Sequence, residues 1–239
     1  MPAGPPREGE NVEVQATVWY ILAITAFIAL LLLYVNSRLK RFDPLTKPKG
    51  VVLLAMIFVQ AIDGMLDKEV RRRDVTEALG PYFGSVAVYM FLCNISGLFA
   101  LDPPTGNFSV TLALASVTVV MIEVYGIKYS GIKGYIKSLC DPIPPFLILN
   151  IIDKFSTWAS LSLRLFGNIM SGSLIMEIIY QMMAIVSSFI PLIGKFNIVG
   201  VIVAPALHFY FDLFAGFMQT FIFTTLSITF IGNAIPKEE

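Results

Sequence analysis

Residues 160–183, SLSLRLFGNIMSGSLIMEIIYQMM, place one arginine inside a segment that is otherwise suited to lipid. A charged side chain at bilayer depth costs on the order of 3 kcal/mol on insertion scales, so Arg164 needs a physical reason to be there. The whole chain shares this apolar character: of its 239 residues, 56% are hydrophobic and 14% charged, and the mean hydropathy is +0.75. We therefore predict a membrane protein.

The apolar runs predict an all-α polytopic membrane protein with about five transmembrane helices and one amphipathic interfacial helix. The last two long helices are expected to form a strongly tilted hairpin. We divide the chain into an external amino-terminal segment (1–17), a first transmembrane helix (18–36), a cytoplasmic loop with the interfacial helix (37–79), a transmembrane hairpin (80–127), a cytoplasmic basic loop (128–145), and the long hairpin with a cytoplasmic tail (146–239).

Two of these segments depart from a simple spanning helix. Residues 51–73 begin apolar and turn polar at Gln60 and Asp63, which favours a helix at the interface over a further full span. No proline occurs in residues 146–190 or in residues 206–235, which makes these runs the two longest potential helices of the chain. As one helix, residues 155–189 would extend about 52 Å, against about 30 Å of hydrocarbon. Such a helix must tilt, bend or leave the membrane for part of its length.

The distribution of lysine and arginine predicts the orientation. These residues cluster after the first, third and fifth spans, so the positive-inside rule places the amino terminus outside and the carboxyl terminus in the cytoplasm. The first residues lack the basic start and small-residue end of a signal peptide, and we expect the first apolar run to be kept. The expected location is the inner (plasma) membrane of the cell.

The long helix is expected to present two polar stripes. Spacings of four, four and three residues put the first stripe on one helical face, and spacings of four put the second roughly opposite. The first consists of Ser160, Arg164, Asn168 and Ser171, and the second of Ser173, Glu177 and Gln181.

The last helix repeats the pattern with His208, Asp212 and Gln219 at spacings of four and seven. An imidazole, a carboxylate and an amide on one face inside a membrane indicate a path for a cation. Simpler roles remain open: Arg164 could pair with the carboxylate of Asp212 or Glu177, and the other groups could form ordinary interhelical hydrogen bonds.

Several function classes are excluded by what the chain lacks. It has no phosphate-binding Gly-Lys loop, no His-Glu-x-x-His motif, no cysteine pair with metal-ligand spacing and only one histidine. We therefore expect no catalytic site, no cofactor and no fixed metal in this chain. A net charge of zero argues against nucleic acid as a partner.

Four segments resemble subunit a of the membrane sector of F-type ATP synthases. They run in family order and include the sequence RLFGN at residues 164–168 with the glutamine helix downstream. The segments are GPYFGSVAVYMFLCNISGLFALDPPTGNFSVTLALA (80–115), YGIKYSGIKGYIK (125–137), SLSLRLFGN (160–168) and FAGFMQTFIFTTLSI (214–228).

The resemblance implies the stator half of a rotary ion turbine. In that family, two half-channels meet a ring of c subunits, each with one carboxylate, on either side of an essential arginine, which Arg164 matches. Asn168 and Gln219 match the family's asparagine and glutamine, and Asp212 falls where relatives carry a Glu or His in the outer half-channel. The implied partners are the c-subunit ring, b-type peripheral stalk subunits, membrane lipid and, indirectly, the soluble catalytic sector, in a bacterium.

One departure from the family pattern leaves the coupling ion open. Many proton-driven relatives carry a carboxylate nine residues after the arginine, where this chain has Ser173. Either Glu177 takes over as a proton relay, or the hydroxyls of Ser171 and Ser173 transiently ligate sodium. We expect protons to be the coupling ion, with sodium as the alternative. A stand-alone secondary transporter or channel built on Arg164 and Asp212 is the rival from another class, and a structural anchor a weaker third.

Overall fold

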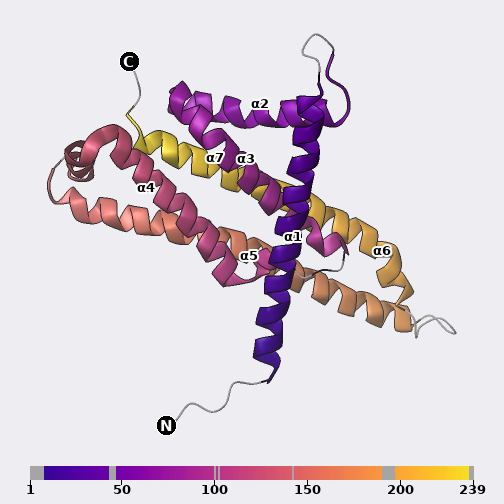
Figure 1. Cartoon of the computed structure of the whole chain (residues 1–239). Helices are drawn as coiled ribbons and strands as arrows, with labels where there is room; N and C mark the ends of the chain where they lie inside the picture. The colour runs from indigo at the N-terminus through magenta and orange to yellow at the C-terminus, as the bar shows by residue number, and fades with distance from the viewer. Residues whose placement is uncertain are drawn as a thin grey trace.

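The computed structural model describes residues 8–42, 47–99, 101, 103–141, 143–189 and 197–236, in which every regular element is helical (Figure 1). The α-helices are α1 (Glu8–Lys40), α2 (Val51–Val70), α3 (Arg73–Ile95), α4 (Phe108–Leu139), α5 (Phe146–Ser188), α6 (Ile198–His208) and α7 (Ala215–Ala234). The shorter elements are the 3-10 turns η1 (Ser96–Phe99) and η2 (Pro104–Gly106) and the π-helical turn η3 (Phe209–Phe214).

Among the described residues, five helical stretches are long and apolar enough to cross a membrane, which confirms the predicted all-α polytopic fold. These are Val18–Lys40, Arg73–Phe99, Phe108–Leu139, Phe146–Ser188 and Ile198–Ala234. The helix α2 is not among them, and Figure 1 shows it lying across the end of α1. That placement suits the interfacial helix expected in residues 51–73.

The two long elements lie at a steep inclination to α1 (Figure 1). With 43 residues, α5 extends about 65 Å. The second element is the continuous run α6–η3–α7 from Ile198 to Ala234. Side by side, they form the tilted hairpin that the proline-free runs predicted, because neither can fit upright in about 30 Å of hydrocarbon.

Three element boundaries differ from the sequence-based division. Residues 1–7 of the expected external segment lie outside the described residues, and α1 already begins at Glu8. Residues 128–139, expected in a loop, continue α4 as helix beyond a kink at Gly131, whose φ of 66° suits glycine. The last helix starts at Ile198 and passes through Pro205, followed by the π-helical turn η3.

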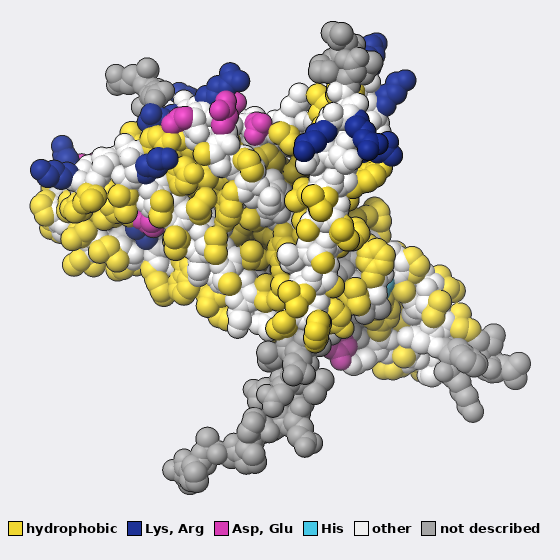
Figure 2. Space-filling view, viewed as in Figure 1, with side chains coloured by type: hydrophobic (Ala, Val, Ile, Leu, Met, Phe, Trp, Pro, Cys, Tyr) yellow, Lys and Arg dark blue, Asp and Glu magenta, His cyan; other side chains and the backbone are white. Residues whose placement is uncertain are grey.

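The outer surface is that of a protein solvated by lipid. Many large apolar side chains are exposed, and hydrophobic atoms cover most of the visible face (Figure 2). Lysine and arginine gather along the edge formed by α2 and the carboxyl-terminal ends of α1 and α4 (Figure 2). This edge is the one that the predicted topology assigns to the cytoplasm.

Two buried apolar clusters hold the helices together. The larger joins α2, α3, α4 and α7, with Leu66, Leu79, Phe83 and Ile231 at its centre. The smaller joins α3, α4, α5 and α7 and is made of Met90, Ala115, Leu161, Leu165 and Phe223. The smaller cluster fixes the middle of α5, since Leu161 and Leu165 are almost fully buried.

An ion pair ties α4 to the first half of α5. The Nζ of Lys154 lies 2.7 and 2.8 Å from the two carboxylate oxygens of Glu123, and it also donates to the Tyr135 hydroxyl at 2.7 Å. Tyr135 follows the Gly131 kink, so the bend in α4 delivers this third partner. All the hydrogen-bonding capacity of the ammonium group is therefore used within the chain.

We expect Lys154→Ala to destabilise the chain by about 2 kcal/mol, because it leaves Glu123 without its counter-ion. The side chains of Lys154 and Glu123 are 34% and 26% exposed, and this contact with solvent limits the loss of stability. The double variant Glu123→Gln with Lys154→Met should lose less stability than Lys154→Ala, since it leaves no unpaired charge at either position. Thermal unfolding of the three full-length chains gives the order, and a double variant less stable than Lys154→Ala would contradict this account.

Candidate ion-path site

Arg164 projects from the outer side of α5. Its neighbours Leu161, Ser162 and Leu165 are buried in the bundle, and this packing directs Arg164 to the exposed side of the helix. Among the described residues, its guanidinium has no hydrogen-bond or ion-pair partner. A charged side chain on an apolar helix is costly in lipid, which makes Arg164 a candidate functional residue.

The simpler alternative, in which Arg164 pairs with a carboxylate of its own chain, has no support among the described residues. Asp212 is paired with His208, and Glu177 with Gln181 at 3.4 Å. Neither carboxylate forms an ion pair with Arg164.

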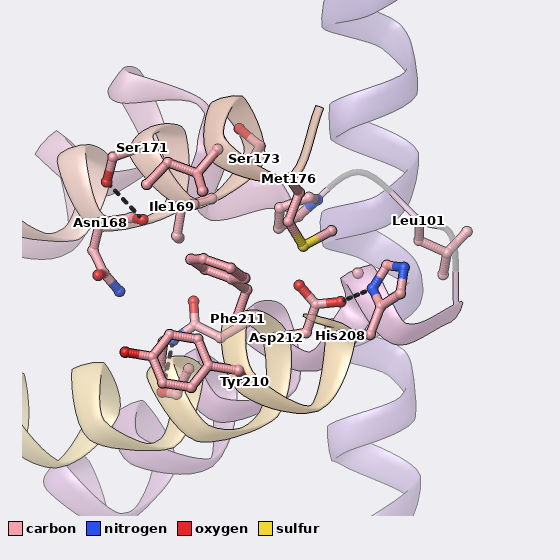
Figure 3. Close-up of a pocket in the computed structure, with 17 residues that line it drawn as sticks. Leu101, Asn168, Ile169, Ser171, Ser173, Met176, His208, Tyr210, Phe211 and Asp212 are labelled. Atoms are coloured by element: carbon pink, nitrogen blue, oxygen red, sulfur yellow. Dashed lines mark hydrogen bonds and ion pairs between the residues drawn. The ribbon is translucent and has the colours of Figure 1, made fainter. Parts of the chain in front are cut away.

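A cavity of about 460 Å³ lies between the two long elements and the end of α3 (Figure 3). It brings together five of the eight predicted site residues, from two helices far apart in sequence: Asn168, Ser171, Ser173, His208 and Asp212. The sequence assigned Ser171 and Ser173 to opposite stripes, yet both line this cavity. It is wide enough to admit water among groups that can hold or pass a cation.

Asp212 is the most enclosed ionisable group of the cavity, with 15% of its side chain exposed. Its Oδ2 lies 2.6 Å from Nδ1 of His208, one turn earlier (Figure 3). On the other side it rests against Gly97 of η1, where an added Cβ would come within 2.9 Å of the carboxyl carbon and Oδ1. The absence of a side chain at position 97 thus makes room for this carboxylate.

His208 has a second partner, which the sequence analysis missed. Its Nε2 lies 3.0 Å from the hydroxyl of Tyr180 on α5. Tyr180 stands seven residues after Ser173 and three after Glu177, so it lies on the second polar stripe. The stripe pattern could have found it if the tyrosine had been counted with the polar residues.

Glu177 opens on a shallower groove along α5 rather than on the cavity. The groove is lined by Ser173, Met176, Glu177, Tyr180, Gln181 and Ala184. Ser173 and Met176 line both the groove and the cavity. Ser173 therefore marks the junction between the two spaces.

The two serines are already engaged with their own helix. The Ser171 hydroxyl donates to the Gly167 carbonyl at 2.6 Å, and the Ser173 hydroxyl donates to the Met170 carbonyl at 3.0 Å. Within the described parts of the chain, no group of three or more His, Cys, Asp or Glu could hold a metal ion. Each hydroxyl oxygen keeps its two lone pairs, but the two serines alone do not form a ready-made cation cage.

Gln219 takes a different place from the other predicted residues. It is buried on α7 with 5% exposure, and it lines neither the cavity nor the groove. Its Nε2 has no hydrogen-bond partner among the described residues. Nearby, Asn94 of α3 donates to the Gly216 carbonyl at 3.2 Å, and an added Cβ at Gly216 would lie 2.9 Å from the Cβ of Asn94. This close α3–α7 contact fixes the floor of the cavity.

Comparison with known proteins connects this arrangement to one family. The model of the family described as ATP synthase A chain matches residues 17–232. Relatives named ATP synthase subunit a include those of Chlorobium phaeobacteroides (30% identical, covering 97% of this chain and 68% of the relative) and Nitrosospira multiformis (30%, covering 93% and 80%). Another is that of Bacillus pumilus, which is 29% identical over 91% of both chains.

Proposed function

Because the chain belongs to the ATP synthase subunit a family, whose members are non-catalytic subunits of the membrane sector, we propose that it is the ion-translocating stator subunit of a rotary F-type ATP synthase. In this role it forms two half-channels that pass ions to and from the carboxylates of a c-subunit ring. The observation that carries the proposal is Arg164, an exposed cation on a long inclined helix that has no partner among the described residues.

The role of Arg164 follows from its chemistry. A guanidinium stays protonated at any relevant pH, so it attracts a ring carboxylate without becoming a proton carrier. As a carboxylate approaches, the fixed positive charge favours its ionised form and helps to release the bound cation. The same charge opposes direct passage of a cation from one half-channel to the other.

The cavity around Asp212 serves as the half-channel on the outer side. Asp212 and His208 are its ion-relay groups, and Asn168, Ser171 and Ser173 supply polar lining. Glu177 lies in the adjoining groove, where it takes the place of the carboxylate missing at position 173. Gln219 belongs to the same ion path but acts from its buried position on α7.

Protons fit the site better than sodium. The carboxylate and imidazole of Asp212 and His208 are in direct hydrogen-bond contact, an arrangement suited to a proton. Sodium requires several converging oxygen ligands, whereas the Ser171 and Ser173 hydroxyl protons are directed at backbone carbonyls of α5. The sodium alternative rests on the lone pairs of these two hydroxyls.

ATP-driven transport in liposomes distinguishes the two ions. With the whole complex reconstituted, we expect ATP to acidify the vesicle interior equally with and without sodium, and a protonophore to abolish the gradient. Sodium uptake that persists or increases with the protonophore would establish sodium as the coupling ion. Transport of neither ion would contradict the proposed function itself.

The topology and partners follow from the same role. We place the amino terminus outside the inner membrane of a bacterial cell and the carboxyl terminus in the cytoplasm, supported by the basic edge at α2. The exposed face of α5 around Arg164 is directed at the c-ring. Purification of the chain should therefore bring with it the c-ring, b-type stalk chains and soluble catalytic subunits, which a stand-alone transporter would lack.

A further inference from the structure

Three side chains form a continuous hydrogen-bonded row from α5 to η3. The Tyr180 hydroxyl lies 3.0 Å from Nε2 of His208, and Nδ1 of His208 lies 2.6 Å from Oδ2 of Asp212. We propose that Tyr180 is a positioning residue, which holds the His208 ring so that an N–H always faces the Asp212 carboxylate. This inference rests on the proposed function of Asp212 as an ion-relay group.

The position of the Tyr180 hydroxyl is set by contacts at the ends of α5 and α6. Asn197 caps α6 by accepting from the Gly200 N–H at 3.0 Å. The same carboxamide accepts from the Ser187 hydroxyl at 3.2 Å and donates to the Tyr180 carbonyl at 3.4 Å. These bonds fix α6 in register against α5, so that His208 on α6 meets Tyr180 on α5.

The tautomer of His208 follows from its two neighbours. An ionised carboxylate can only accept, so Nδ1 must carry the proton when Asp212 is charged. The other nitrogen, Nε2, is then an acceptor, and the Tyr180 hydroxyl donates to it. The neutral ring is thereby held in the tautomer whose Nδ1–H donates to the Asp212 carboxylate.

A hydroxyl is suited to this position because it can both donate and accept. When a proton reaches the ring, both nitrogens carry hydrogen, and the Tyr180 oxygen turns from donor to acceptor. Hydrogen bonds to a charged group are stronger than those between neutral groups, so Tyr180 stabilises the protonated ring more than the neutral one. Removing the hydroxyl should therefore disfavour the protonated state.

Few other ionisable groups face His208. Asp212 and Tyr210 come from η3, and Tyr180 comes from α5, with Glu177 one turn away in the groove. The described parts of α3 and η1 that line the cavity contribute only Asn94 and Gly97, which do not titrate. No lysine or arginine is among the described residues that line the cavity and the groove, so no fixed cation there hides the effect of the Tyr180 hydroxyl.

The first test is the pH profile of proton-driven ATP synthesis by the reconstituted complex carrying Tyr180→Phe. We expect half-maximal rate at an outer-side pH lower by about half a unit, because water replaces part of the lost hydrogen bond at the 32% exposed His208 side chain. The matched control is Tyr125→Phe on α4, whose hydroxyl has no hydrogen-bond partner among the described residues, and it should leave the profile unchanged. A Tyr180→Phe profile that is lower in height but has the same midpoint would show a merely structural role and overturn the proposal.

The second test reads the ring directly and does not depend on transport. His208 is the only histidine, so the full-length chain labelled with ¹⁵N-histidine in liposomes gives signals from one ring. At a pH where the ring is neutral, we expect the proton on Nδ1, and in Tyr180→Phe we expect the Nε2 signal to move toward that of a nitrogen without a hydrogen bond. A proton on Nε2 in the unmodified chain, or an Nε2 signal unaffected by Tyr180→Phe, would overturn the proposal.

The two tests separate failure of this inference from failure of the proposed function. If the complex transports no ions, the pH profile cannot be recorded and the proposed function fails, while the ring signals still report whether Tyr180 holds His208. If transport is normal and the ring signals contradict the expected tautomer, only the role of Tyr180 is lost.

Discussion

Replacing Arg164 by Ala or Gln is expected to abolish ATP-driven ion transport while leaving assembly of the complex largely intact. Transport fails because no fixed charge remains to favour release of the cation from a ring carboxylate. Assembly survives because Arg164 has no partner within the described chain, so its loss leaves no unpaired charge behind. The measurement is ATP-driven vesicle acidification, with subunit content checked on the same preparation.

The matched control for Arg164 is Arg73→Ala. Arg73 is an exposed arginine at the start of α3, and its ion pair with Glu77 at 3.2 Å is a surface pair worth little. This variant should transport at the unmodified rate. Transport retained in Arg164→Ala at the level of Arg73→Ala would refute the role of Arg164.

Replacing Asp212 by Asn should reduce proton transport at least about a hundredfold, the lower end of the range for loss of a positioned proton-transfer group. The amide has nearly the same shape and still fits against Gly97, so the cavity should persist. It cannot be ionised, however, and the relay from His208 ends there. Rates of ATP-driven acidification at several pH values measure the loss.

The control for Asp212 is Asp153→Asn, which neutralises an exposed carboxylate near the start of α5. It lies outside the cavity and the groove, and its transport rate should not change. Equal rates in Asp212→Asn and Asp153→Asn would mean that ions do not pass through Asp212.

Hydrophobic patterning was sufficient to predict the membrane helices, and helical periodicity to group the polar residues of α5. A run of about twenty apolar residues has few alternatives to a spanning helix, and helical periodicity places Arg164 and Asn168 on one side. The pair of His208 and Asp212 was also within reach, because residues four apart meet on a helix.

Periodicity could not say which face of one helix packs against which neighbour. The contacts of Tyr180 with His208 and of Gly97 with Asp212 join residues far apart in sequence, and tertiary packing alone decides them. The burial of Gln219, away from the cavity, has the same origin. The passage of the last helix through Pro205 was missed because proline usually ends a helix, whereas here the π-helical turn η3 follows it.

The central claim is that the charge of Arg164 separates two ion paths, and passive proton flux tests it most directly. In the intact complex without nucleotide, the attached catalytic sector prevents free rotation, so an imposed membrane potential should drive little flux through the unmodified protein. With Arg164→Ala, we expect protons to leak between the half-channels without rotation. An Arg164→Ala complex whose passive proton flux is as low as that of the unmodified complex would contradict the claim.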